Sequence, residues 1–451
     1  MAVLILELAT VCWGEVDLEH ILSLASKVAE EVEVFRSSTE QTPVVFETNR
    51  LKQLHTQQGV VTTLRVVRNG KIGLATAAGP CNAERLVERA VALAELGVDS
   101  HLELPVQERY PDVNIKDAEV EHITVEEMVY LGETLIEGII QHAPELICEV
   151  EIAKQAASVK VINSRGGEAA YEKSIFSVGL EGTLVRGTDM LFVFDSEASC
   201  HPIRSVDKLH RCIIRQMDWA RENVAVDTGR LPVIFTPQGV ASVFTAPLMT
   251  AFNGKIVLQG ASPLGDKLGK RVFDERLNIC DDATLDYRPG SYPCDDEGVK
   301  GQKTPLVEGG VVANFLYDLQ TAGQAGVSST GNGDRGGGEK PSPSSSNIVI
   351  GAGNMPFEDM VRDMREGLIV EYLMGAEQGN VLGGDFSGNI LLGYKVENGE
   401  VVGRVKDTML SGNIYRILER LIALGNESEW VGGSFCSPAF YCSDMAVAVK
   451  E

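Results

Sequence analysis

Histidine is absent from the second half of the chain. Residues 211–451 contain none, and the seven histidines are His20, His55, His101, His122, His142, His201 and His210. Histidine is the commonest metal ligand and the usual general base in proteins. The second half therefore has no histidine-ligated zinc site and no Ser-His-Asp triad of its own.

Positive charge is also scarce. The 451 residues include 40 Lys and Arg against 64 Asp and Glu, which gives a formal net charge of -24 at pH 7. Affinity for nucleic acid comes largely from Lys and Arg side chains that neutralise phosphates. We therefore expect no direct contact with nucleic acid.

The nine cysteines form no C-x-x-C pair, and their number is odd. This pattern favours a reducing compartment over a disulfide framework, so we expect a cytoplasmic protein. The apolar opening carries no positive charge, and its first charged residue is Glu7. We interpret residues 1–18 as an extended leader or a first strand, and not as a signal peptide.

The longest uncharged run, residues 231–254, is long enough to cross a bilayer. It contains Gln238, Asn253 and three prolines, which would leave polar groups unsatisfied in lipid. We therefore expect this run to be buried core, and we expect no membrane association.

Glycine is unevenly distributed along the chain, since residues 1–230 hold only 14 of the 46 glycines. This difference in composition indicates two parts that meet near residue 230. We predict the α+β class. Residues 19–228 are expected to form an N-terminal α/β domain of helices packed on a mostly antiparallel sheet. Residues 229–451 are expected to form a β-rich C-terminal domain with a few helices.

Local patterns predict several elements. Asn69-Gly70 indicates a tight hairpin, and Thr124 with Glu127 forms a capping box at the start of a helix. In the first part we predict a hairpin of 60–67 and 71–77, helices over 83–96 and 205–221, and strands from 146 to about 194. In the second part we predict a strand at 232–235, helices over 355–365 and 413–424, and a hairpin of 389–396 and 401–406.

Residues 323–346 are rich in glycine and serine and nearly free of apolar side chains. Composition alone leaves a flexible surface linker and an ordered functional loop equally open. Within this stretch, residues 331–336 match G-x-G-x-x-G. Pro341 and Pro343 follow too closely for a helix to begin, which argues against a dinucleotide site.

Two other groups of side chains are candidates for chemistry. Cys200, His201, His210 and Cys212 are soft ligand types, but positions two apart on a helix diverge, so we expect a core cysteine beside a surface histidine. Asp281-Asp282 and Asp295-Asp296-Glu297 concentrate carboxylates. A cation site or an acid/base pair is one interpretation, and a solvated acidic turn is the one we favour.

An ordered series of short motifs resembles a known family. The series is C-D-D-E-G-V-K-G-Q at 294–302, S-T-G-N-G-D-R at 329–335, P-S-P-S-S-S-N at 341–347, G-D-F-S-G at 384–388, G-Y-K-V-E-N-G at 393–399, V-K-D at 405–407, S-G-N at 411–413 and L-G-N at 424–426. It is similar to the TldD/PmbA family, also called peptidase family U62 or "modulator of DNA gyrase".

The resemblance implies a two-domain α+β fold and a cytoplasmic role in proteolysis of small or unfolded peptides and peptide precursors. It also implies a dimer that encloses the site. In that dimer a TldD-type subunit holds zinc through H-E-x-x-x-H and a C-terminal cysteine, whereas a PmbA/TldE-type subunit lacks the motif. The charge of this chain argues against a literal reading of the gyrase name.

In this chain the corresponding helix, at 236–244, has neither His nor Glu, and Cys436 stands near the position of the family's cysteine. A lone cysteine cannot hold catalytic zinc. The resemblance is therefore to the PmbA/TldE type, with no zinc cofactor in this chain. A TldD-type zinc subunit is expected as its partner in a heterodimer, with a homodimer as the alternative.

The resemblance also favours an ordered loop at 323–346 that lines the cleft. It makes Asn332, Arg335 and Asn347 candidates to bind a peptide backbone, which commonly adds as a strand to a sheet edge. Two alternatives stay open. One is an autonomous or homodimeric hydrolase that uses Cys436 or the carboxylates Asp295, Asp296 and Glu297 with another metal, and the other is a non-catalytic peptide-binding protein.

Overall fold

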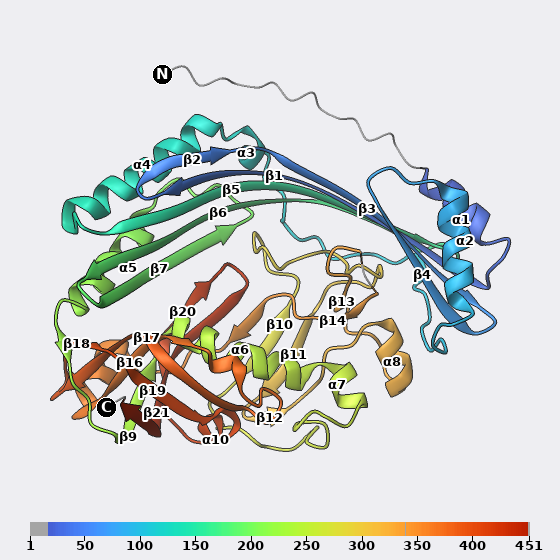
Figure 1. The fold of residues 1–451 in the computed structure, drawn as a ribbon. Coiled ribbons are helices and arrows are strands. Elements are labelled where there is room, and N and C mark those ends of the chain that lie inside the picture. Colours follow the sequence, from blue (N-terminus) through green and yellow to red (C-terminus); the bar gives the residue numbers. More distant parts are fainter. Residues whose placement is uncertain (1–16, 339, 450–451) are drawn as a thin grey trace.

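The computed structural model describes residues 17–338 and 340–449. Within them the chain forms two large β-sheets and a small two-stranded one, with helices packed on the large sheets. Figure 1 shows the first large sheet arching over the second part of the chain. The α+β class is confirmed. Residues 1–16 of the predicted leader lie outside the described residues. Leu18, its last residue, begins helix α1.

The first large sheet has the order β4-β3-β1-β5-β6-β7, with β2 paired to β1, and its pairs are antiparallel. The predicted hairpin around Asn69-Gly70 is β3 and β4. The strands are β1 (Glu31–Glu47), β2 (Arg50–Leu54), β3 (Gln57–Arg68), β4 (Lys71–Ala78), β5 (Ile147–Asn163), β6 (Glu168–Arg186) and β7 (Asp189–Ser199).

Helices cover this sheet at both ends. Side chains alternate along a strand, so Val32 and Val34 of β1 pack under α1 and α2, whereas Glu33 lies on the opposite face. At the other end α4 and α5 pack on β5, β6 and β7, and the predicted capping box of Thr124 begins α4. The helices are α1 (Leu18–Ala25), α2 (Ala83–Ala94), α3 (Ala118–His122), α4 (Val125–His142) and α5 (Asp207–Trp219).

The second large sheet is mixed, with the order β12-β11-β10-β15-β21-β9-β16-β17-β18-β8; β19 pairs with β17 and β21, and β20 pairs with β21. Its strands are β8 (Asn223–Val224), β9 (Gly229–Phe235), β10 (Ile279–Asp282), β11 (Lys303–Glu308), β12 (Val311–Val312), β15 (Ile348–Ile350), β16 (Glu366–Met374), β17 (Asp385–Glu397), β18 (Glu400–Val405), β19 (Thr408–Asn413), β20 (Leu421–Val431) and β21 (Phe435–Val449).

The uncharged run at 231–254 divides between β9 and helix α6, which packs on β16 and β21. Phe235, Phe244 and Phe252 are buried in the core there, as predicted. No helix among the described residues is both long and apolar enough to span a membrane. The helical elements of this part are α6 (Pro237–Phe252), α7 (Gly254–Leu258), α8 (Leu319–Ala325), α9 (Phe357–Asp363), α10 (Ile414–Glu419) and the 3-10 turn η1 (Ala376–Gln378).

The predicted helix at 413–424 is half wrong. Its first part is α10, but Leu421 begins β20 and pairs with Cys442 of β21. Gly425 therefore lies inside a strand and does not end a helix. The apolar spacing fits a helix throughout, and pairing with β21 overrides it after Arg420. The hairpin of β17 and β18 is confirmed, and the helix predicted at 355–365 is α9, shorter at both ends.

Candidate functional site

The glycine-rich stretch at 323–346 is an ordered loop in its described residues. It contains the end of α8 and the strands β13 (Gly333–Asp334) and β14 (Ser342–Pro343), which pair with each other. It also docks on the first sheet, because the Gly338 carbonyl accepts hydrogen bonds from Thr63 Oγ1 at 3.0 Å and Thr76 Oγ1 at 2.7 Å. The flexible-linker interpretation is wrong, and the loop joins the two parts of the molecule.

The carboxylate groups are not solvated turns. Asp295 and Glu297 are 3% and 0% exposed, and Asp281 is 1% exposed. The favoured interpretation fails because Asp281, Asp295 and Glu297 have polar partners on distant segments of the chain. Asp295 accepts hydrogen bonds from the backbone N–H groups of Glu297, Val299 and Gly333, at 3.0, 2.9 and 2.8 Å. These bonds fix the turn at 295–299 against β13.

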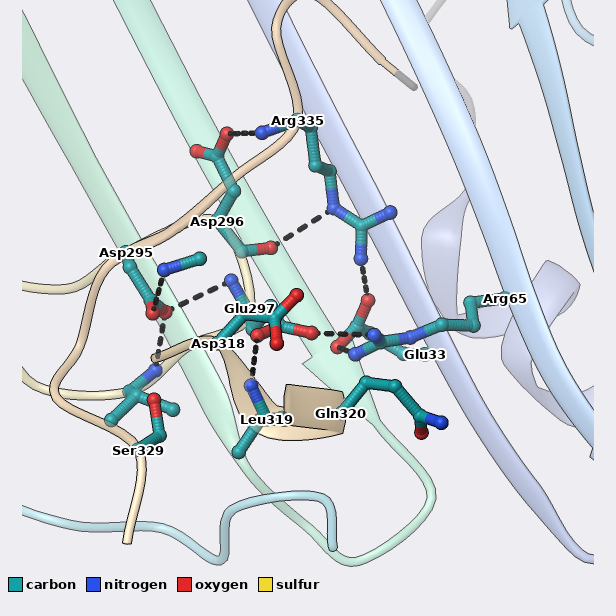
Figure 2. Close-up of polar contacts among 12 residues, drawn as sticks. Glu33, Arg65, Asp295, Asp296, Glu297, Asp318, Leu319, Gln320, Ser329 and Arg335 are labelled. Carbon is teal, nitrogen blue, oxygen red and sulfur yellow. Dashed lines mark hydrogen bonds and ion pairs between the residues drawn. The ribbon is translucent and has the colours of Figure 1, made fainter. Parts of the chain in front are cut away.

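A buried network of ion pairs joins this turn and loop to the first sheet (Figure 2). Glu33 of β1 lies opposite Arg65 of β3 in the strand register. Arg65 donates to Glu33 Oε2 at 2.6 Å and to Glu297 Oε1 at 2.5 Å. Arg335 donates to Glu33 Oε1 and, through Nε, to the Asp296 carbonyl at 3.1 Å. Two arginines and two glutamates from four segments thus meet with almost no exposure to solvent.

Burial dominates the electrostatics of this network. It raises the pKa of the Asp296 carboxyl to about 7 and lowers the pKa of the Arg335 guanidinium to about 9. The pKa of Glu297 is raised mainly by burial, and the charge of Arg65 opposes that shift. A buried charge is tolerated when it is paired and hydrogen-bonded, so each member depends on the others. This arrangement suits a structural link between the two parts more than a catalytic acid.

The three predicted substrate contacts are buried and are held by the chain itself. Arg335 belongs to the network above. Asn332 donates to Asp281 Oδ2 at 2.7 Å and to the Ser344 carbonyl at 3.0 Å. Asn347 donates to the Asp282 carbonyl at 2.7 Å and to Ser291 Oγ at 2.8 Å. The amide oxygens of the two asparagines and the Nη1 atom of Arg335 lack a partner among the described residues, so a peptide-binding role for the three residues stays a prediction.

Helix α6 was expected at the place of the family's zinc motif, and its side chains do not suit zinc. Residues 237–252 contain no His, Cys, Asp or Glu. Cys436 is 7% exposed, it pairs with Trp430 across β20 and β21, and burial raises the pKa of its thiol. Across the part of the chain that the structure describes, no three His, Cys, Asp or Glu side chains are grouped as metal ligands. The donor set thus fits no catalytic zinc.

The other soft-ligand cluster also has ordinary partners. Cys200 is buried, whereas His201 is exposed and stacks on Tyr287 with ring centroids 3.4 Å apart. The Nδ1 atom of His201 lies 2.6 Å from Asp117 Oδ2. The expected core cysteine beside a surface histidine is found for Cys200 and His201, whereas His210 and Cys212 of α5 are both half-buried.

A cavity of about 380 Å³ opens where α5 of the first part meets the second part. The N-terminus of α6 forms part of its wall, with Thr236 as the N-cap residue. The remaining walls come from α5, β7, the start of α9, β20 and β21. The lining residues are Asp195, Lys208, Arg211, Cys212, Arg215, Thr236, Pro237, Gln238, Pro356, Phe357, Glu358, Gly425, Asn426, Glu427, Glu429, Trp430, Val431 and Ala439.

Comparison with protein families agrees with this architecture. The PmbA/TldA metallopeptidase C-terminal domain matches residues 228–449, and domain 1 of the same family matches residues 32–94. Together the two matches cover more than half of the chain. The chain belongs to the PmbA/TldD family. The ordered motif series between 294 and 426 falls within the first of these matches.

Full-length relatives of this PmbA/TldD chain are distant in sequence. It is 26% identical over 435 residues to an uncharacterized protein of Methanocaldococcus jannaschii, covering 94% of this chain and 98% of that protein. It is 25% identical over 444 residues to a metalloprotease of Methanothermobacter thermautotrophicus, covering 94% of each. The solved structure of TldE from Thermococcus kodakarensis has a TM-score of 0.86 at 23% identity, covering 96% and 99%, and shows the same fold.

Sequence reasoning missed Glu33, Arg65 and Glu371 of this PmbA/TldD chain. Glu371 is fully buried in β16 and accepts hydrogen bonds from Gln216 Nε2 at 3.0 Å and Arg215 Nη2 at 3.1 Å. One signal was available, since Glu371 is the only charged residue within the apolar run 368–374. A charge inside an apolar strand indicates a buried partner. The identity of that partner does not follow from local sequence.

Proposed function

We propose that this chain is the PmbA/TldE-like subunit of a two-subunit cytoplasmic metallopeptidase that acts on small or unfolded peptides and peptide precursors. In this proposal a TldD-type partner supplies the zinc, and this chain carries none. The observation that supports it most directly is α6, which occupies the expected place of the zinc helix without a single metal-ligating side chain. The family match covers the domain that contains this helix.

The chain's own part in this function is to complete the peptide site. The outermost strands of the two sheets include β4 and β8, and an extended peptide commonly adds as a strand at a sheet edge. The docked loop at 323–346 keeps the two sheets in a fixed relation through Gly338 and Arg335. Zinc, when bound in the partner, would supply an activated water and polarise the scissile carbonyl.

Coexpression with a TldD-type protein that carries H-E-x-x-x-H tests the proposal. The two chains should elute together from a size-exclusion column, and the complex should cleave an unfolded peptide that neither chain cleaves alone. A complex whose partner has the glutamate of that motif replaced serves as the control, because it should assemble without cleaving. Two separate species on the column would contradict the proposal.

A further inference from the structure

The cavity beside α5 has a basic wall. Lys208, Arg211 and Arg215 follow one another at spacings of three and four residues, so they lie on one face of the helix. Arg215 is held in position because it donates to the buried Glu371 and stacks on Trp219, with its guanidinium carbon 5.2 Å from the ring centroid. Its side chain is nevertheless 40% exposed. One guanidinium is therefore preoriented, and the two exposed cations Lys208 and Arg211 lie on the same face of the helix.

Acidic side chains line the same cavity from other elements. Glu427 and Glu429 come from β20, and Glu358 comes from the first turn of α9. Within residues 17–338 and 340–449 these three glutamates form no ion pair, and neither do Lys208 and Arg211. Lys208, Arg211 and the three glutamates thus line one cavity without ion pairs to each other. Arg215 is paired with Glu371, and Asp195, which also lines the cavity, accepts a hydrogen bond from Gln238.

The remaining wall supplies polar and apolar contacts. Gln238, in the first turn of α6, donates to Asp195 Oδ1 at 2.8 Å, and the N-terminus of this helix of 16 residues adds a partial positive charge. Phe357 and Trp430 present aromatic surface. The volume lies in the range of about 300–1,000 Å³ that is typical of small-ligand sites. The cavity is thus large enough for a few amino-acid residues and too small for a folded partner.

We propose that this cavity binds short peptides with free termini, with the carboxylate against the α5 wall and the ammonium group against Glu427 and Glu429. A ligand with one charge would satisfy one set of side chains and leave the other unpaired, whereas a zwitterion satisfies both. The inference rests on the proposed function in one respect, namely that the ligands of this chain are peptides. It requires neither zinc nor a partner subunit.

Calorimetric titration of the full-length chain with trialanine tests this site. We expect trialanine to bind, and we expect its N-acetylated and C-amidated forms to bind about tenfold more weakly, because each loses one charge-assisted contact. Equal affinity for the three peptides, or no binding of any, would overturn the proposal.

Charge-neutralising variants locate the two ends of the peptide. R211Q should weaken trialanine binding and should reduce the difference in affinity between trialanine and its C-amidated form. E429Q should also weaken trialanine binding, and it should reduce the difference in affinity between trialanine and its N-acetylated form. K255Q and E400Q remove one exposed charge each outside the cavity and should bind like the unmodified chain. If all four variants behave alike, the binding site is elsewhere and the proposal fails.

This titration is separate from the test of the proposed function. Failure of the isolated chain to bind trialanine leaves coelution with a TldD-type protein unaffected. If the chain binds trialanine but does not coelute with a TldD-type protein, the subunit assignment is overturned and the proposal of a peptide-binding cavity stands.

Discussion

At the scale of single residues, the molecule depends on charges that are buried and paired. Glu33 and Arg335 are separated by 302 positions in sequence, yet they form an ion pair with both side chains 0% exposed. Their positions in the sequence carry no sign of this contact, because it depends on how the loop docks on the first sheet. Sequence reasoning selected Arg335 through its motif, but it did not find Glu33 or Arg65.

Replacing Arg335 should therefore reduce stability strongly. R335M leaves the Oε1 atom of Glu33 buried without its cation, and breaking a buried pair in this way costs about 3–5 kcal/mol of unfolding free energy. Urea denaturation followed by circular dichroism measures the change. R204M removes an exposed partner of Glu119 and should change the midpoint little. Similar midpoints for the two variants would contradict a structural role for the network.

Asp296 should make stability depend on pH in the direction opposite to an ordinary surface aspartate. Burial raises its pKa from 3.8 to about 7, so the folded chain binds a proton that the unfolded chain releases. Its contribution to stability is full below the unfolded value and is lost as the pH rises through about 7. Thermal unfolding of the unmodified chain and of D296N between about pH 4.5 and pH 8 measures this. The stability of D296N relative to the unmodified chain should rise with pH over this range, and a constant difference would contradict the shift.

At the scale of elements, local signals predicted best where local geometry decides the outcome. The capping box of Thr124 and the hairpins around Asn69-Gly70 and Asn398-Gly399 need only neighbouring residues, and the structure confirms them. The predicted helix at 413–424 failed where β21 paired with its second half. The acidic turn at 295–297 was misjudged for the same reason, since its partners lie on β3, on β13, at the start of α8 and at Arg335.

The docked loop offers an element-scale test at Gly338. This residue has φ +112°, and a Cβ atom added there would lie 2.3 Å from Val61 Cγ1, so G338A should detach the loop from β3 and β4. Hydrogen exchange at 331–346 should then become faster. G336A is a matched control, because it also has positive φ but meets nothing within 4 Å. Equal exchange in the two variants would mean that the docking at Gly338 does not hold the loop.

At the scale of the whole molecule, the two parts share packing as well as charges. One hydrophobic cluster includes Leu209 and Ile213 of α5 together with Ile234 of β9 and Tyr394 of β17. The composition and glycine distribution of the sequence predicted the α+β class, and the motif series predicted the family. The cavity beside α5 was beyond sequence reasoning, since its walls come from α5, α6, α9, β7, β20 and β21.

The central claim is that this chain completes a zinc peptidase without holding zinc. Metal analysis of the purified chain, alone and in complex with a TldD-type protein, tests it most directly. The chain alone should contain no stoichiometric zinc after dialysis in a zinc-containing buffer, and the complex should contain one zinc per pair of chains. The donor-free α6 predicts this difference. One tightly held zinc in the isolated chain would contradict the account.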